Sequence, residues 1–334
     1  MRVLLTNDDG PPNETTSPYI FAFYNHLTAF GWDVKVVLPS SQKSWIGKSS
    51  KSFHITEITK GRYFYPTKDS GGLVGETSTT SRPLKDGEIA EWILLDSTPS
   101  TCANVGLHNI YPNQIDLVIS GPNLGRNTSS AFALSSGTIG AALDGSLSKI
   151  RSIAVSYGTI VHPTPKTYVE PCHLLACRHL WSNWGKDEGG LRSGEVDFYS
   201  VNIPLVEGLL SNEGLKVAWT SMWRNSYGRL FKTVSSTTPT TGDQSASAAG
   251  PDAPTTDLPN TEAKSTTSED GPLTFKFSPA MDGLIRPVES SLPVGSDGWA
   301  ISKGWASVTP LRASFAEPVQ ETQDIEDRIW KMKL

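Results

Sequence analysis

The chain has 334 residues, a net charge of −5 and 37% hydrophobic residues, which is enough to bury a large core in one or two domains. The acidic balance argues against a protein that coats nucleic acid, because such a protein needs a basic face. No apolar stretch is long enough to cross a bilayer, and the first residues lack the basic and apolar regions of a secretory signal. Three cysteines are too few for a disulfide framework. We therefore expect a cytoplasmic protein with no membrane or nucleic-acid partner.

The amino-terminal residues predict a βαβ unit. Residues 3–5 form a short apolar run, which is typical of a strand buried on both faces. Residues 20–30 place apolar side chains at helical spacing, and we expect Ser17 as the N-cap and Pro18 as the first residue of this helix. Residues 32–38 are rich in valine and predict the second strand.

The next segment mixes predicted strands with polar loops. Residues 39–51 form a loop rich in serine and lysine, and residues 53–58 and 89–95 are predicted strands. Between these strands, residues 68–82 are rich in glycine, threonine and serine and predict a surface excursion. A threonine followed by proline then opens a helix predicted over residues 98–108.

The third predicted strand, at residues 115–119, is followed by a polar loop over residues 120–127. A helix is predicted over residues 139–147, with the sequence Ser-Gly-Thr at 136–138 as its start. Free backbone N–H groups at such a start favour an anion. Two further elements follow in chain order: a strand at 151–156 and an amphipathic helix at 168–184.

The composition changes sharply after the predicted core, which covers residues 1–232. Residues 233–272 are mostly Ser, Thr, Pro, Ala, Gly and Asp, and such a segment cannot bury enough apolar surface to offset its ordering entropy. We predict a disordered insert, because the alternative of an O-glycosylated stalk would require secretion. Residues 273–334 complete the core and end in a predicted helix at 321–334. Other ordered elements are expected at 196–201, 215–219, 273–277 and 299–311.

Polar side chains follow three of the predicted strands. In an open α/β sheet, ligands bind beyond the carboxyl ends of the strands. Asp8 and Asp9 follow the first strand, Ser44 the second and Asn123 the third. Two adjacent carboxylates repel each other unless a proton or a cation neutralises them, and oxygen ligands suit Mg²⁺ or Mn²⁺. If the three strands are neighbours, these residues form a metal site beside a phosphate-binding helix start; otherwise Asn-Asp-Asp-Gly is a solvated turn.

Taken together and in order, these motifs resemble the SurE survival-protein family. The resemblance depends on Asn-Asp-Asp-Gly at 7–10, Ser-Gly-x-Asn-x-Gly-x-Asn at 120–127 and Ser-Gly-Thr at 136–138, with weaker matches at 97–99 and 304–311. The chain is similar to a fungal-type member with a low-complexity insert. The resemblance implies a Rossmann-like three-layer αβα core with a mainly parallel sheet and a C-terminal arm of a β-hairpin and a helix.

The resemblance also implies roles for individual residues. Asp8 and Asp9 would be the catalytic pair, and one divalent cation per subunit, Mg²⁺ or Mn²⁺, would be held by Asp8, Asp9, Ser44 and Asn123. The phosphate-binding residues of the family match Asn127, Ser136, Gly137 and Thr138. The family usually has glycine after the loop serine, whereas Trp45 follows Ser44 in this chain, so Ser49 stays an alternative ligand.

The reaction that the resemblance implies is hydrolysis of a phosphate monoester, with nucleoside monophosphates as substrates. Two alternatives stay open. One is a covalent phosphatase with Asp8 as nucleophile, a class that typically has Asp-x-Asp spacing. The other is a nucleotide-binding module that does not catalyse a reaction. A dinucleotide-binding fold is disfavoured because no Gly-x-Gly-x-x-Gly follows the first strand.

The C-terminal segments also predict self-association. In the family, the segments after the core form arms that pair between subunits. The strand pieces at 229–234 and 273–277, and the apolar stripe of Ile325, Ile329 and Trp330, have no obvious partner within one chain. We therefore expect a homodimer or a higher homo-oligomer.

Overall fold

The computed structural model of the chain describes residues 1–49, 58–161, 163–184, 196–233, 274–279, 282–285 and 287–315. The strands are β1 Arg2–Thr6, β2 Asp33–Pro39, β3 Gly61–Pro66, β4 Gly75–Ser78, β5 Trp92–Leu95, β6 Leu117–Leu124, β7 Arg151–Gly158, β8 Phe198–Pro204, β9 Val217–Trp219, β10 Phe231–Thr233, β11 Phe275–Phe277 and β12 Ala306–Leu311. The α-helices are α1 Ile20–Ala29, α2 Pro99–Val105, α3 Ser129–Ser135, α4 Gly137–Leu147, α5 Val169–Trp184, α6 Asp282–Ile285 and α7 Asp297–Ser302. A π-helical turn at Gly106–Ile110 continues α2, and short 3-10 turns lie at Lys166–Tyr168, Glu207–Leu210 and Glu289–Ser291.

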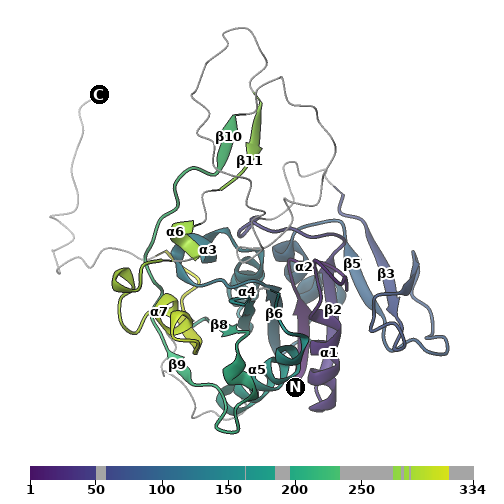
Figure 1. The fold of residues 1–334 in the computed structure, drawn as a ribbon. Helices are drawn as coiled ribbons and strands as arrows, with labels where there is room; N and C mark the ends of the chain where they lie inside the picture. Colours follow the sequence, from purple (N-terminus) through teal and green to yellow (C-terminus); the bar gives the residue numbers. More distant parts are fainter. Residues whose placement is uncertain are drawn as a thin grey trace, which may run out of the picture.

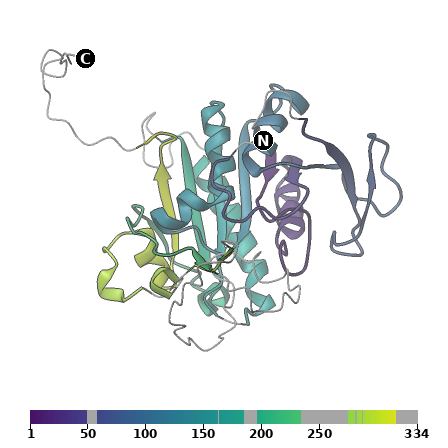
Figure 2. The ribbon, with the colours of Figure 1, turned by 90° about the horizontal axis from the view of Figure 1, so that it is seen from above.

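One mixed sheet forms the centre of the described part of the chain, with helices on both faces (Figures 1 and 2). Its strand order is β4-β3-β5-β2-β1-β6-β7-β8-β12-β9. The six strands from β5 to β8 are parallel to one another, and the antiparallel pairs of this sheet lie outside them, toward its two edges. The predicted α/β class with a mainly parallel, three-layer core is confirmed.

Side-chain alternation along β1 divides the core into two apolar layers. Val3 and Leu5 pack on one face with residues of α1 and α5. Leu4 packs on the other face with Cys102 of α2 and with Leu107. All three β1 side chains are fully buried, which explains why this strand is apolar at successive positions.

Two local predictions are wrong, and one is refined. Ser17 does not cap α1, which begins at Ile20, because the Ser17 hydroxyl donates to the carbonyl of Gly10 at 2.9 Å instead. Residues 120–127 are not all loop, because β6 continues to Leu124 through an irregularity in its pairing with β7. The expected surface excursion at 68–82 lies on the surface, and it contains the exposed strand β4, which pairs with β3 and extends the sheet edge.

Several predicted segments fall wholly or partly outside the residues that the structure describes. Residues 53–57 of one predicted strand, residues 234–272 of the predicted insert and the predicted helix at 321–334 lie outside the described residues. The proposed division into core, insert and C-terminal part therefore stays a prediction. The strands on either side of the insert, β10 and β11, pair with each other as an antiparallel ribbon, seen above α3 and α6 in Figure 1. These two strand pieces thus have a partner within one chain, although the oligomeric state itself stays a prediction.

Among the described residues, no helix is both long enough and apolar enough to cross a membrane.

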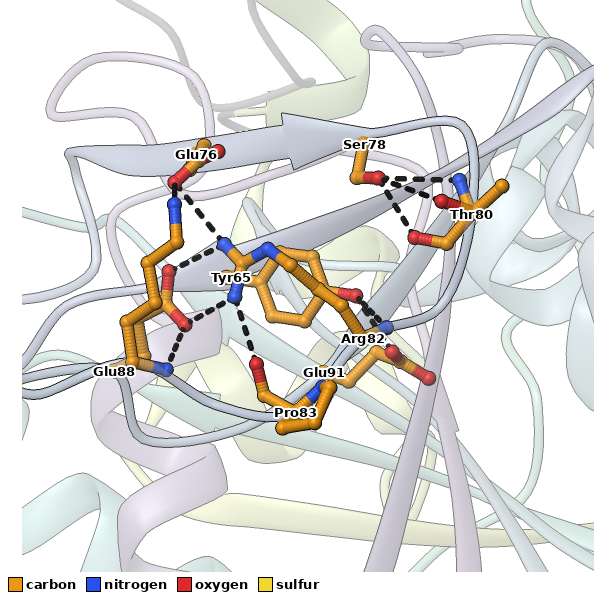
Figure 3. A network of polar contacts seen from close by, with 9 residues as sticks. Tyr65, Glu76, Ser78, Thr80, Arg82, Pro83, Glu88 and Glu91 are labelled. Atoms are coloured by element: carbon orange, nitrogen blue, oxygen red, sulfur yellow. Dashed lines mark hydrogen bonds and ion pairs between the residues drawn. The ribbon is translucent and has the colours of Figure 1, made fainter.

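Arg82 holds the β3–β4 edge of the sheet together (Figure 3). Its guanidinium lies 3.8 Å from the centre of the Tyr65 ring and forms ion pairs with Glu88 at 2.7 Å and Glu76 at 3.1 Å. The Glu88 side chain is only 4% exposed. The hydrogen bond from Arg82 lowers the pKa of Glu88 to about 2.

This ion pair predicts a pH-dependent contribution to stability. Because the pKa of Glu88 is lower in the folded chain than its ordinary value of 4.5, the ionised carboxylate stabilises the fold above pH 4.5, and this stabilisation is lost as the pH falls toward 2. We expect Glu88→Gln to lower the thermal midpoint at pH 7, by an amount that shrinks below pH 4.5. Calorimetry with the exposed-site variant Glu14→Gln as control measures this, and a midpoint difference that is independent of pH would contradict it.

Candidate active site

The loops that follow β1, β2 and β6 meet at one edge of the sheet. β1 lies between β2 and β6 and is parallel to both, so their carboxyl ends face the same way. A cavity with a volume of about 20 Å³ lies there, and five of the residues singled out in the sequence line it: Asp8, Ser44, Asn123, Asn127 and Ser136. The requirement that the three strands be neighbours is therefore met.

Asn7 closes the turn that carries the two aspartates. Its side-chain oxygen accepts from the N–H of Gly10 at 2.9 Å, and its amide nitrogen donates to the Gly10 carbonyl at 2.9 Å. Gly10 has a φ of +86°, and a Cβ there would lie 3.2 Å from the backbone of Ser41. The N–H of Lys43 donates to the carbonyl of Asp8 at 2.7 Å, which ties the β2 loop to this turn. The Asn-Asp-Asp-Gly sequence is thus a buried, hydrogen-bonded turn.

The Asp8 carboxylate lies against the start of α4. The Thr138 hydroxyl donates to Asp8 Oδ1 at 2.5 Å, and the backbone N–H groups of Gly137 and Thr138 act on the same carboxylate by lowering its pKa. Asp8 is 3% exposed, and burial raises its pKa above the ordinary value although these hydrogen bonds act in the opposite direction. Glycine at 137 permits this approach, since a Cβ there would lie 2.8 Å from Asp8 Cβ.

Asp9 is buried beside Asp8 and is also 3% exposed. The N–H of Leu124, at the end of β6, donates to Asp9 Oδ2 at 2.8 Å. Burial and the neighbouring charge of Asp8 raise the pKa of Asp9 well above its ordinary value. Among the ion pairs within the described residues, none involves Asp8 or Asp9. The chain therefore buries two like charges without a cationic side chain between them.

Asn123 and Ser44 add neutral oxygen atoms to the cavity. The Asn123 amide donates through Nδ2 to the carbonyl of Gly125 at 2.7 Å, so its side-chain oxygen remains for a ligand. Ser44 lines the cavity. The alternative ligand Ser49 is not among the lining residues, and its backbone carbonyl accepts a hydrogen bond from the Thr98 hydroxyl.

Asn127 is positioned by two buried residues that the sequence did not single out. Its backbone N–H donates to Asn202 Oδ1 at 2.6 Å, and its side-chain Nδ2 donates to Ser156 Oγ at 2.9 Å. Asn202 lies on β8 and Ser156 on β7, and both are fully buried. A polar residue between apolar neighbours in a buried strand was the available signal, because a buried amide or hydroxyl requires hydrogen-bond partners.

The three residues at the start of α4 differ in position. Ser136 lines the cavity, and its hydroxyl caps α4 by accepting from the N–H of Ile139 at 3.2 Å. Gly137 and Thr138 are buried and direct their donors toward Asp8. The assignment of all three as phosphate ligands stays a prediction, and the contact that this structure shows for Gly137 and Thr138 is with the carboxylate.

The donor set suits a hard divalent cation. Two buried carboxylates with raised pKa values gain from a cation at their open side, and the adjacent serine and asparagine supply further oxygen ligands. No group of three His, Cys, Asp or Glu side chains able to hold a metal occurs within the described ranges. An ion at this position therefore requires the neutral oxygens of Ser44 and Asn123, or water, to complete its shell.

A family model, described as "Survival protein SurE", matches residues 3–229. The chain belongs to the SurE family. The matched region contains every site residue named above and ends before β10, so the insert and the C-terminal segments lie beyond it.

Individual relatives match between about half and two thirds of the chain. A "Probable tubulin--tyrosine ligase PBY1" of Saccharomyces cerevisiae is 35% identical over 69% of this chain and 32% of its own length. A "5'-nucleotidase SurE" of Pelobacter propionicus is 31% identical over 61% of this chain and 66% of its own length, and one of Desulforudis audaxviator is 30% identical over 47% and 50%. The match thus spans about a third of the yeast relative and between half and two thirds of these bacterial relatives.

The solved structure of the SurE protein from Aquifex aeolicus shares the fold. It superposes with a TM-score of 0.57 at 22% identity and covers 95% of both chains. This likeness supports the fold of the SurE chain described above.

The Thr138–Asp8 hydrogen bond can be tested through stability. Thr138→Val keeps the side-chain shape but leaves a buried carboxylate oxygen short of one donor, which costs about 1–3 kcal/mol. We expect a lower urea midpoint for Thr138→Val, while Thr138→Ser, which retains the hydroxyl, stays closer to the wild type. Equal midpoints for the valine variant and the wild type would show that the hydroxyl does not support Asp8.

Proposed function

We propose that this SurE chain is a divalent-metal-dependent phosphomonoesterase that acts on nucleoside monophosphates. The observation that carries the proposal is the buried Asp8–Asp9 pair, which stands beside a cavity lined by neutral oxygen donors and lies at the start of α4. Two uncompensated carboxylates are costly in the fold, and a site that binds both a cation and a phosphate group gives them a role.

The names of relatives support the reaction class. The bacterial SurE proteins that match this chain are named 5'-nucleotidases, and a nucleotidase cleaves a phosphate monoester. The ligase name of the yeast relative belongs to a protein of which this chain matches 32%, so we do not transfer that activity. Because the chain also covers less than two thirds of each bacterial relative, substrate and metal remain part of the proposal.

The residues present suggest how the reaction would proceed. A bound divalent ion supplies charge neutralisation and Lewis-acid polarisation of a phosphoryl oxygen. Asp8 and Asp9 hold the cation, together with the oxygens of Ser44 and Asn123. Thr138 and the first N–H groups of α4 fix the orientation of Asp8, and the N–H of Leu124 fixes Asp9.

Proton transfer and phosphate binding fall to groups at the same edge. One of the two aspartates accepts the proton of the attacking water, a role for which its raised pKa is suitable. Asn127 and Ser136 line the cavity where the phosphate oxygens would lie. Because Asn127 is held through both its backbone and its side chain, its position changes little as charge builds up on the phosphate.

The spacing of the two aspartates disfavours a covalent mechanism. Phosphatases with an aspartate nucleophile typically have Asp-x-Asp spacing, whereas Asp8 and Asp9 are adjacent. A binding module without turnover uses the same residues, and an activity measurement separates it from an enzyme.

The aspartate pair gives the main test of the proposed activity. Asp9→Asn removes one negative charge from the cation site while leaving the N–H of Leu124 an oxygen acceptor. We expect hydrolysis of AMP to fall at least about 100-fold, because both cation occupancy and transition-state charge stabilisation are lost. A chelator should lower the wild-type rate similarly, and added Mn²⁺ or Mg²⁺ should restore it.

The control for this test is Asp33→Asn, which changes an exposed aspartate at the opposite end of β2. It should keep the wild-type rate. Undiminished AMP hydrolysis by Asp9→Asn in the presence of a chelator would remove both the aspartate and the metal from the mechanism.

A further inference from the structure

Trp45 has a backbone conformation that is unfavourable for tryptophan. Its φ is +62°, in the left-handed region, where a residue with a Cβ is strained and glycine is not. The loop that carries it is fixed on both sides of Trp45. The N–H of Lys43 donates to the backbone carbonyl of Asp8 at 2.7 Å, and the N–H of Gly47 donates to the carbonyl of Ser135 at 2.9 Å. The surroundings therefore impose the backbone conformation, and a bulky side chain at this position requires another explanation.

The indole of Trp45 and the ring of Phe132 together line the cavity that holds Asp8 and Asn127. We call these two side chains the rim wall. Their ring centres lie 6.2 Å apart at 69°, and Phe132 is buried. The Trp45 indole also contacts Phe277 of the β10–β11 ribbon at 5.5 Å, which supports it from outside the cavity. An aromatic surface thus adjoins the carboxylate pair.

The size of the cavity determines what the rim wall contacts. A volume of about 20 Å³ is room for a cation or for a phosphate oxygen that reaches into the cavity, and it is far too small for a nucleoside. The leaving group of a phosphomonoester therefore cannot enter and must extend across the rim. Apart from Asp8, every residue that lines the cavity is neutral, so the lining offers an anionic leaving group no partner of opposite charge. A flat, neutral ring matches an aromatic wall best.

We propose that Trp45 determines leaving-group specificity by stacking on a flat aromatic ring, such as the base of a nucleoside monophosphate. This inference rests on the proposed phosphomonoesterase function and adds to it the residue that recognises the leaving group. Stacking between a base and an aromatic side chain does not depend on base identity, because every base has a π face. The enzyme is then selective for aromatic over aliphatic phosphomonoesters and tolerant among bases.

AMP and ribose 5-phosphate form a matched pair for the test, because both are 5'-phosphates of ribose and only AMP has a base. We expect the wild type to prefer AMP in kcat/KM. In Trp45→Ala the ratio of the two values should fall about tenfold, mainly through KM, within the range that loss of one stacking side chain produces. Trp45→Phe, which keeps an aromatic ring, should retain most of the preference. A ratio unchanged in Trp45→Ala would overturn the proposal.

Two further variants separate recognition from a structural role. Trp45→Gly relieves the backbone strain, so it provides a folded chain if the alanine variant is unstable, and it should lose the preference as Trp45→Ala does. Phe277→Ala removes the support outside the cavity and should reduce the ratio less than loss of the indole. Equal losses in Phe277→Ala and Trp45→Ala would show that Trp45 acts only by anchoring the ribbon. Trp219→Ala, at an exposed tryptophan on edge strand β9, is the control.

A binding measurement distinguishes failure of this inference from failure of the proposed function. Saturation-transfer NMR with adenosine or ribose requires no turnover. We expect adenosine, and not ribose, to bind the wild type, and adenosine binding to be lost in Trp45→Ala. If neither AMP nor ribose 5-phosphate is hydrolysed, the proposed function fails. Binding of adenosine that depends on Trp45 would still support the stacking role in that case. Adenosine that binds both proteins equally would overturn it.

Discussion

Asp8 and Asp9 lie buried side by side at the end of the central strand, and the arrangement around them follows from that charge. Taking two carboxylates out of water is expensive, and each further raises the cost of ionising the other. The fold responds with hydrogen-bond donors: the start of α4 and the Thr138 hydroxyl face Asp8, and the N–H of Leu124 faces Asp9. These donors reduce the cost without removing it, because the pKa values of both groups remain raised. The cation that we propose for this site would offset the remaining cost.

The same constraint explains several choices of residue and topology. Glycine at 137 lets α4 approach the carboxylate, and the Asn7 side chain closes a turn that places both aspartates at the same sheet edge. The neighbouring strands β2 and β6 bring Ser44 and Asn123 to that edge because all three strands are parallel. Helix, turn and sheet order thus converge on one small cavity, which the rim wall also lines.

The sequence predicts this convergence because strand-end motifs are local. An apolar run followed by Asp8-Asp9, and a second run followed by Asn123, place polar residues at strand ends whatever the rest of the chain does. Longer-range partners carry a weaker signal: Asn202 and Ser156 stand out as polar residues inside buried strands, but their contact with Asn127 depends on the packing of β7 and β8. The left-handed φ of Trp45 likewise depends on contacts from segments distant in sequence, and the glycine that the family usually has at this position was the signal for it.

Direct observation of the cation tests the account most simply. A crystal of the intact chain soaked in MnCl₂, with anomalous data collected at the manganese edge, locates the ion without reference to activity. The account predicts a manganese peak bounded by the carboxylates of Asp8 and Asp9 and by the side-chain oxygen of Asn123. A map with no peak between the two carboxylates, from crystals in which manganese occupies other positions, would contradict it.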